Sequence, residues 1–216
     1  MKRIDVDVSE EVYQYLDRRE REAEEEGYKR GVLGKGVRPI TEKLVDELIQ
    51  GGILVHEHGG SEPIPRMYDE FDMGISFTRA GLRAAVIKTH YSPSASRVGL
   101  VQRYVNEWAE REGLAPVEIF GGLVLNYPVG GLNPAAVRAC ARFPNGKFVW
   151  MPTVDSFNHI QVTQGASTGY IQDVVQAGIR AVDEKGRVAE EMKEIFRVIS
   201  DNDMVLTIGH HSYPEL

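Results

Sequence analysis

Blocks of apolar residues alternate with amphipathic segments along most of the chain. Short apolar runs typical of buried strands occupy residues 53–56, 84–90, 117–126, 147–153 and 204–210. Between these runs, apolar residues recur at helical spacing over 67–80, 96–112, a segment that opens at Asn133-Pro134, and 189–199. Strands separated by helices of this length form βαβ units, so the pattern predicts a parallel sheet. The polar stretch 155–172 is expected to be a long loop over the end of the sheet.

Residues 1–50 lack this alternation and are expected to form an N-terminal helical extension to a barrel-type domain at 51–216. Ser9 can cap a helix that runs to about Gly27, and residues 18–26 of that helix are nearly all charged. The charged half is either a solvated helix face or an oligomer contact. Residues 31–39 resemble a loop, and Thr41 can cap a second, short helix that ends before Gly51.

The C-terminal segment predicts an unfinished barrel. Ser212 to Glu215 has the form of a capping box that begins a helix, but the chain ends at Leu216. About five βα units are recognisable, whereas a closed barrel of this type has eight. We therefore predict an α/β fold of the TIM-type (β/α) barrel class that is incomplete at its C-terminus, with the later strands missing. An open sheet, and a complete fold with a frayed tail, are the alternatives.

Composition limits the classes of function. The formal net charge of -7 argues against non-specific nucleic-acid binding, which needs a basic face. The one cysteine, Cys140, excludes an internal disulfide and fits a reducing compartment. No apolar run approaches ~18 residues, and the N-terminus has no signal-peptide core. We expect a cytoplasmic protein without membrane or nucleic-acid partners, acting on a small-molecule substrate, with a homo-oligomer as an open option.

All six histidines lie at the end of a predicted strand or in the loop that follows one. They are His56 and His58 on the first, His90 on the second, His159 after the fourth, and His210 and His211 on the fifth. Functional sites in α/β sheets and barrels form at the carboxyl ends of strands. The set therefore predicts a metal site, although any single histidine could be a hydrogen-bonded structural residue.

Strand alternation selects among these histidines. Residues i and i+2 of a strand point to the same side, so His56 and His58 are expected to project together, on the same face as Leu54. The two rings could then hold one metal ion. On the fifth strand the same rule makes His210 the better ligand, with His211 in a supporting or loop position.

Other polar residues at the strand ends are candidate catalytic groups. Lys88 is expected one layer below His90, where a buried lysine is costly unless it is paired or modified. It could be carboxylated and bridge two metals, pair with Asp155 or substrate, or extend out of the strand end. Asn126 could orient water or substrate, or cap the next loop. Asp155 could transfer a proton or form an Asx turn, and His159 is a second candidate for proton transfer.

Several segments resemble a known family. They are Val55-His-Glu-His-Gly59, Val86-Ile-Lys-Thr-His-Tyr-Ser-Pro93, Phe120-Gly-Gly-Leu-Val-Leu-Asn126, Val129-Gly-Gly-Leu-Asn-Pro134, Val149-Trp-Met-Pro-Thr153 and Ile208-Gly-His-His-Ser212. Together they are similar to an uncharacterised family of predicted metal-dependent hydrolases related to the amidohydrolase superfamily. The resemblance implies a (β/α) barrel with one or two divalent metal ions, zinc in the first place, at the strand ends. It implies His56 and His58 as first-strand ligands and His210 as a later-strand ligand.

The sequence also departs from that superfamily. A further histidine and a late aspartate usually complete the metal site, and no residue after Leu216 provides them. The usual bridging lysine comes from a middle strand, whereas Lys88 lies on the second. His90 on the second strand instead resembles the metal phosphoesterases of the polymerase-and-histidinol-phosphatase type.

We therefore predict an enzyme, a metal-dependent hydrolase in which metal-activated water attacks an amide, ester or lactone carbonyl. His90 would close the site or hold a second ion, and Asp155 or His159 would transfer the proton. Histidine-rich ligation favours Zn²⁺, Ni²⁺ or Co²⁺ over Mg²⁺.

Two alternatives are a metal-dependent phosphoesterase on the same scaffold and a non-catalytic truncated barrel. The phosphoesterase would need positive charge near the phosphate, which Lys88, Arg66 and Arg97 could supply. A truncated barrel would expose a sheet edge to association.

Overall fold

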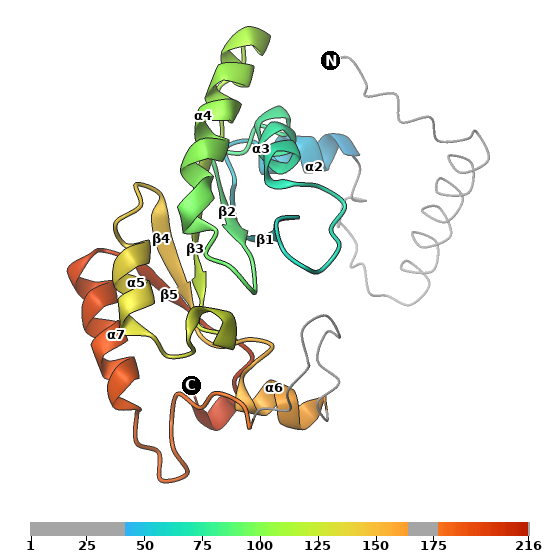
Figure 1. Cartoon of the computed structure of the whole chain (residues 1–216). Coiled ribbons are helices and arrows are strands. Elements are labelled where there is room, and N and C mark those ends of the chain that lie inside the picture. Colours follow the sequence, from blue (N-terminus) through green and yellow to red (C-terminus); the bar gives the residue numbers. More distant parts are fainter. Residues whose placement is uncertain (1–41, 164–176, 216) are drawn as a thin grey trace, which may run out of the picture. The chain divides into compact units, whose positions relative to one another are not determined.

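The computed structural model describes residues 42–163 and 177–215 (Figure 1). Its chain divides into two compact units, Met1–Glu47 and Leu48–Leu216. Helix α2, Glu42–Ile49, confirms the short helix expected after Thr41. The helix predicted from Ser9 and the loop at 31–39 lie outside the described residues. The rest of the fold belongs to the second unit.

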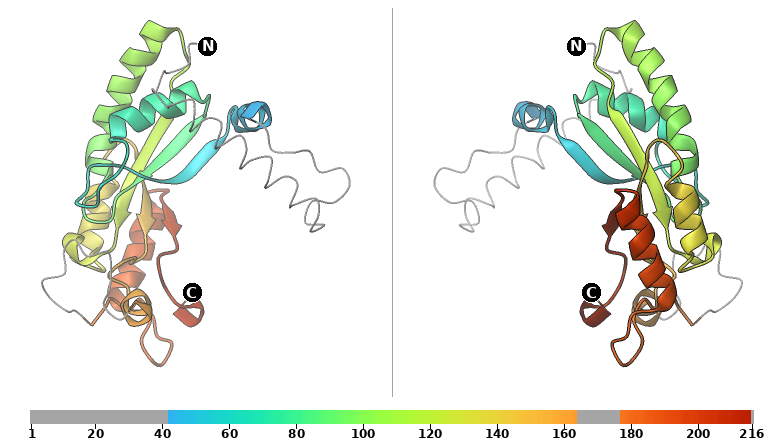
Figure 2. Two further views of the ribbon diagram at one scale, coloured as in Figure 1. Left: turned by 90° about the vertical axis from the view of Figure 1, so that its right-hand side faces the viewer. Right: turned by 90° about the vertical axis from the view of Figure 1, so that its left-hand side faces the viewer.

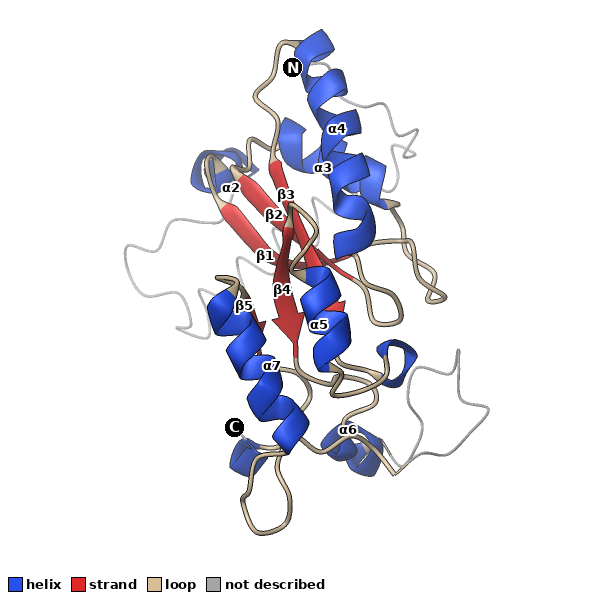
Figure 3. Ribbon diagram, turned by 60° about the vertical axis from the view of Figure 1, so that its left-hand side comes forward, coloured by secondary structure: helices blue, strands red, loops and turns tan. Residues whose placement is uncertain are grey.

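Five parallel strands form one sheet in the sequential order β1-β2-β3-β4-β5 (Figures 1 and 3). The strands are β1 Ile53–His58, β2 Ala84–Lys88, β3 Glu118–Val124, β4 Gly146–Trp150 and β5 Val205–Thr207. The sheet curls into a half-barrel (Figure 2). The predicted α/β class and parallel sheet are confirmed, and the curled sheet is compatible with a partial barrel.

Four helices pack on one face of the sheet, which we call the outer face. They are α3 Glu70–Arg79, α4 Ala95–Glu112, α5 Pro134–Cys140 and α7 Glu190–Asp201. Helices α3 and α4 share a core with Ala85, Ile87 and Ile119, and α5 and α7 share one with Leu123 and Val149. Because alternate residues of each strand supply these contacts, the helices leave the other face free for polar groups. None of the described helices has the length and apolar character needed to cross a membrane.

The opposite, inner face of the sheet carries a smaller aromatic cluster. Val86, Val124 and Trp150 are buried there, with Phe120 and Phe148 packed against them. Ile53 on β1 is 55% exposed, at one edge of the sheet. Apolar exposure at an unpaired strand edge is a known route to association, but oligomerisation of this chain stays a prediction.

A β-bulge in β1 changes which of its residues share a face. Leu54 pairs with Ala85, but Glu57 pairs with Ile87 and His58 with Lys88, so one extra residue is inserted between them. Leu54 therefore packs against the outer core, while His58 lies with Lys88 on the inner face. The prediction that Leu54 shares the face of His58 was wrong, because alternation holds only without a bulge.

The polar segments between strands also differ from expectation in two places. Helix α3 begins at Glu70 and not at residue 67, because Asp69 caps it by accepting a hydrogen bond from the N–H of Asp72 at 2.9 Å. The expected loop at 155–172 contains a short helix, α6 Phe157–Val162, which Ser156 caps. The expected Asn133 cap of α5 and the Ser212–Glu215 capping contact are both present.

Candidate metal centre

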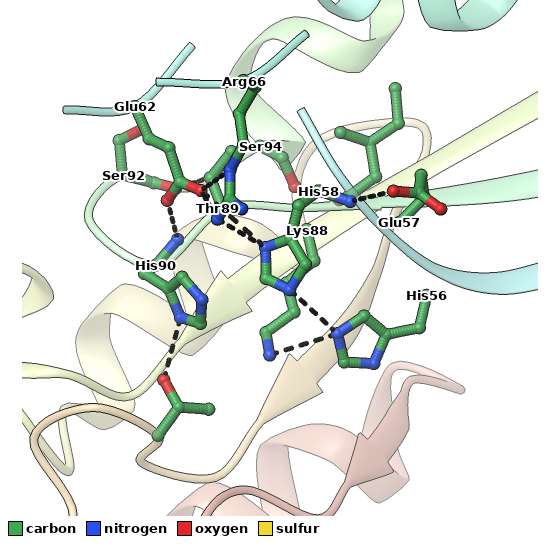
Figure 4. Close-up of polar contacts among 12 residues, drawn as sticks. His56, Glu57, His58, Glu62, Arg66, Lys88, Thr89, His90, Ser92 and Ser94 are labelled. Atoms are coloured by element: carbon green, nitrogen blue, oxygen red, sulfur yellow. Dashed lines mark hydrogen bonds and ion pairs between the residues drawn. The ribbon is translucent and has the colours of Figure 1, made fainter. Parts of the chain in front are cut away.

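The carboxyl ends of β1 and β2 bring a cluster of ionisable side chains together, which we call the first cluster: His56, His58, Glu62, Lys88 and His90 (Figure 4). The Nε2 atoms of His56 and His58 lie 3.2 Å apart. The His58 ring stacks on His90 with 4.6 Å between centroids. Three of the six histidines predicted at strand ends, His56, His58 and His90, thus meet at one place.

Glu62 is the member of the cluster that the sequence analysis missed. One ligand atom from each of His58, Glu62 and His90 lies within 4.8 Å of the others, the separation that a shared metal ion requires. The Glu62 side chain is fully buried, and its Oε2 accepts a hydrogen bond from the N–H of His90 at 2.7 Å. Arg66 donates to Oε1 at 2.6 Å. In the sequence, only the position of Glu62, four residues after His58, indicated this role. A loop has no periodicity, so the sequence does not show in which direction the Glu62 side chain points.

The Glu62 carboxylate carries a negative charge at neutral pH. Burial alone would raise its pKa, but hydrogen bonds from His58, the N–H of His90 and Arg66 lower the pKa to about 2. A buried carboxylate beside two histidines is a set of donors suited to a divalent cation.

Hydrogen bonds from residues that follow β3 and β4 hold His90 in place. Its Nδ1 lies 3.0 Å from the Thr153 hydroxyl, which leaves Nε2 as the ring atom available to a metal. Asn126 is fully buried and donates to both the Thr153 hydroxyl at 2.9 Å and the carbonyl of His90 at 3.1 Å. The Asn126 side chain makes no cap for the following turn, contrary to one of its two predicted roles. It ties three strand ends together and positions His90.

Lys88 is 2% exposed, so it does not extend out of the strand end. Its Nζ lies 3.4 Å from Nε2 of His56 and 5.9 Å from the centre of the Trp150 ring. Burial lowers its pKa to about 8. Pairing with Asp155, one of the alternatives offered for Lys88, is absent among its contacts, and Asp155 instead accepts the backbone N–H of Tyr127 at 2.8 Å. Carboxylation of Lys88 stays a prediction.

A second cluster forms where β4 and β5 end. The Nδ1 atoms of His159 and His210 lie 2.9 Å apart, and the two rings stack. Ser156 donates to the carbonyl of His210 at 2.9 Å, which joins the two loops. Burial and the neighbouring His159 lower the pKa of His210 to about 4. His210 therefore lies beside His159, and its role as a ligand of the same ion as His58 stays a prediction.

Two further predicted residues lie close to this second cluster. Burial raises the pKa of Asp155, and its charge acts on His159. Its bond to the N–H of Tyr127 occupies one carboxylate oxygen, so Asp155 has a structural contact beside its predicted role in proton transfer. His211 is buried against Glu215, with Nδ1 3.5 Å from the carboxylate, and its supporting role at the site stays a prediction.

Residues 51–216 match a family described as a family of unknown function, DUF6282. The chain belongs to the DUF6282 family. The match includes every strand among the described residues and both histidine clusters of this DUF6282 protein. Comparison with curated proteins gave no significant match, and comparison with solved structures gave none either. The family description names no activity, so the geometry of the site is the basis for a function.

A buried ion pair joins helices α3 and α4, which follow the loops carrying Glu62 and His90 in this DUF6282 protein. Arg97 Nε donates to both carboxylate oxygens of Glu70, at 3.0 and 2.8 Å, and Glu70 is 2% exposed. The same guanidinium donates to Ser92 at 3.1 Å and to Thr89 at 3.2 Å, on either side of His90. Arg97 is thus occupied, which removes it as the free phosphate-binding cation of the phosphoesterase alternative.

We expect Arg97→Lys to weaken metal binding about tenfold and to lower stability by about 1–2 kcal/mol. Lysine keeps the charge but cannot bind Glu70 through two nitrogens and reach Ser92 and Thr89 as well. Zinc titration and urea unfolding measure the two effects. Arg103→Lys, at an exposed position of α4, is the matched control and should change neither. Wild-type zinc affinity in Arg97→Lys would contradict the role of this ion pair.

The metal-free protein should lose stability as the pH falls below about 6.5. Burial, followed by the charge of Lys88, lowers the pKa of His90 to about 3, from an ordinary value of 6.5. The unfolded chain therefore binds a proton that the folded chain does not bind. This difference lowers the free energy of unfolding by up to about 1.4 kcal/mol per pH unit and per histidine. His210, with its pKa of about 4, adds to the same trend. Urea unfolding at pH 7.5, 6.5 and 5.5 tests this, and His90→Gln should flatten the profile.

Proposed function

We propose that this protein is a metal-dependent hydrolase whose divalent ion is held by His58, Glu62 and His90. The observation that supports the proposal is the convergence of one ligand atom from each residue within 4.8 Å. His56 lies next to this group and is a fourth candidate ligand. The donors are two or three imidazoles and one carboxylate, which favours Zn²⁺, with one or two ions in the site.

A bound ion would act as a Lewis acid that activates water and polarises the bond attacked. The residues of the chain prepare the site for it. The low pKa of His90 keeps its ring neutral, as a metal ligand must be, and Thr153 sets its orientation. Arg66 neutralises part of the charge of Glu62 while the carboxylate stays buried.

Proton transfer is proposed for the second cluster. Burial lowers the pKa of His159, and that of His210 is about 4, so both rings are neutral at pH 7 and can accept a proton. After burial and the neighbouring His159, the charge of Lys88 also lowers the pKa of His210. A substrate bound at the inner rim of the sheet would be exposed to both groups.

The fold supports an amidohydrolase-type enzyme. Consecutive parallel strands, helices on the outer face and polar side chains at the carboxyl ends are the arrangement of (β/α) barrels. We therefore propose a TIM-type barrel relationship, with an amide, ester or lactone as the bond cleaved. Lactones and esters are the first choice because they need no help for a poor leaving group.

Two measurements on the full chain test the proposal. Zinc content after purification, followed by cobalt substitution and its absorption spectrum, tests the ion and the nitrogen-rich ligands. A panel of p-nitrophenyl esters, lactones, anilides and p-nitrophenyl phosphate then tests the reaction. We expect one zinc or more per chain and metal-dependent cleavage of a carbonyl substrate. Cleavage of the phosphate alone would replace the proposal by a phosphoesterase, and a protein that binds no metal would refute it.

A further inference from the structure

A pocket of about 500 Å³ lies beside the first cluster, between β1, helix α3 and the segment before α3. We call it the α3 pocket. Its walls are mainly apolar and come from Met67, Tyr68, Met73 and Phe77, with Glu57, His58 and Arg66 as ionisable neighbours. Pockets of this size hold small organic molecules, and they are typically apolar with a few polar groups that orient the ligand.

Two residues belong both to the α3 pocket and to the proposed metal centre. His58 lines the pocket and also supplies a candidate ligand atom. Arg66 lines the pocket while its Nη2 lies 3.4 Å from Nδ1 of His58 and 2.6 Å from Glu62. A molecule whose reacting group meets the ion can therefore place its next atoms in this pocket.

The pocket walls indicate the kind of group that fits. Methionine and aromatic side chains offer apolar surface, and methionine adapts to ligands of different shape. Met67 is 87% exposed and Tyr68 is 51% exposed, so the entrance is open to solvent. Arg66, which also donates to Glu62, is the cation among the lining residues, and Glu57 is a carboxylate among them. A molecule with one carboxyl-derived end and a hydrophobic chain or ring complements this arrangement.

We propose that the α3 pocket binds the hydrophobic acyl group of the substrate, so that the substrates are esters or lactones of medium-chain or aryl carboxylic acids. The proposal rests on the proposed hydrolase function. It adds a substrate class, which neither the family description nor the metal centre provides. The same pocket should bind the corresponding free carboxylate, with its hydrocarbon part against the apolar walls.

Binding of carboxylates to the full-length protein tests the pocket without any reaction. Calorimetric titration with octanoate and with acetate compares a chain that fills the pocket with one that cannot. Octanoate should bind at least tenfold more tightly, because its additional methylene groups leave water. Equal binding of the two anions would overturn the proposal.

A variant that fills the pocket gives a sharper test. Ser76 lines the α3 pocket from an exposed position of α3, so Ser76→Phe narrows the pocket without touching the core. It should weaken octanoate binding at least tenfold and leave acetate binding unchanged. Glu107→Phe adds the same ring to an exposed position of α4, remote from the pocket lining, and is the control. If the Ser76→Phe variant binds octanoate as tightly as the parent protein, octanoate binds elsewhere and the proposed pocket is refuted. Ser76→Leu serves if the phenylalanine variant does not fold.

The outcomes separate this proposal from the hydrolase itself. If octanoate binds with the expected dependence on residue 76 but no ester is cleaved, the pocket stands and the hydrolase does not. If the zinc-loaded protein cleaves p-nitrophenyl acetate and octanoate equally well, and Ser76→Phe changes neither KM, the hydrolase stands and the pocket is refuted. Under the proposal, Ser76→Phe raises KM for the octanoate ester at least tenfold and spares the acetate ester.

Discussion

Replacement of His58 by alanine is expected to lower zinc affinity by at least about 100-fold, more than removal of a supporting hydrogen bond would. His58 contacts three other members of the first cluster, His56, His90 and Glu62. Its ring lies 3.2 Å from His56, stacks on His90 and has Nδ1 3.7 Å from the Glu62 carboxylate. Loss of the His58 ring would leave only Glu62 and His90 of the three proposed ligands. Zinc titration against a chromophoric chelator measures the change, and the cobalt spectrum reports the loss of a nitrogen ligand.

The matched control for this variant is His159→Ala. It removes an imidazole of similar exposure from the second cluster and leaves the contacts of His58 intact. Zinc affinity should stay within about threefold of the parent, while any hydrolytic rate should fall by about 100-fold if His159 transfers the proton. A zinc affinity unchanged in His58→Ala but lost in His159→Ala would move the metal centre to the second cluster.

Replacement of Gly122 by alanine should destabilise the sheet by about 3 kcal/mol or more. Gly122 lies on β3, next to the bulge where the register with β4 shifts. A Cβ at this position would overlap the carbonyl oxygen of Phe148 and press on the Trp150 ring. The obstacle is backbone of the neighbouring strand, so it cannot rotate aside as a side chain can. Urea unfolding measures the loss, which should also reduce soluble yield.

Gly99→Ala is the opposite control for the same substitution. Gly99 is exposed within helix α4, and an added Cβ meets no atom within 4 Å. Alanine should therefore stabilise the protein by about 0.5–1 kcal/mol through its higher helix propensity. If Gly122→Ala were as stable as the parent, the close approach of β3 and β4 at this point would be wrong.

Much of the architecture follows from residue patterns alone. The apolar runs predict all five strands, and α4 begins and ends within a residue of its predicted bounds because Val98, Val101 and Val105 keep helical spacing up to Gly113. Histidines at strand ends were expected to gather because parallel strands end at one edge of a sheet. The structure brings His56, His58 and His90 together in this way.

The remaining features of the site could not be predicted from local sequence patterns, because they depend on contacts between residues far apart in the chain. Glu62 becomes a candidate ligand only when its loop folds back onto the N–H of His90, 28 residues later. Strand alternation misplaced Leu54 because a bulge is a property of the pair β1 and β2 and not of one strand. The pairing of His210 with His159 depends on how two loops pack. Periodicity therefore determines where strands end, and long-range packing determines which side chains meet there.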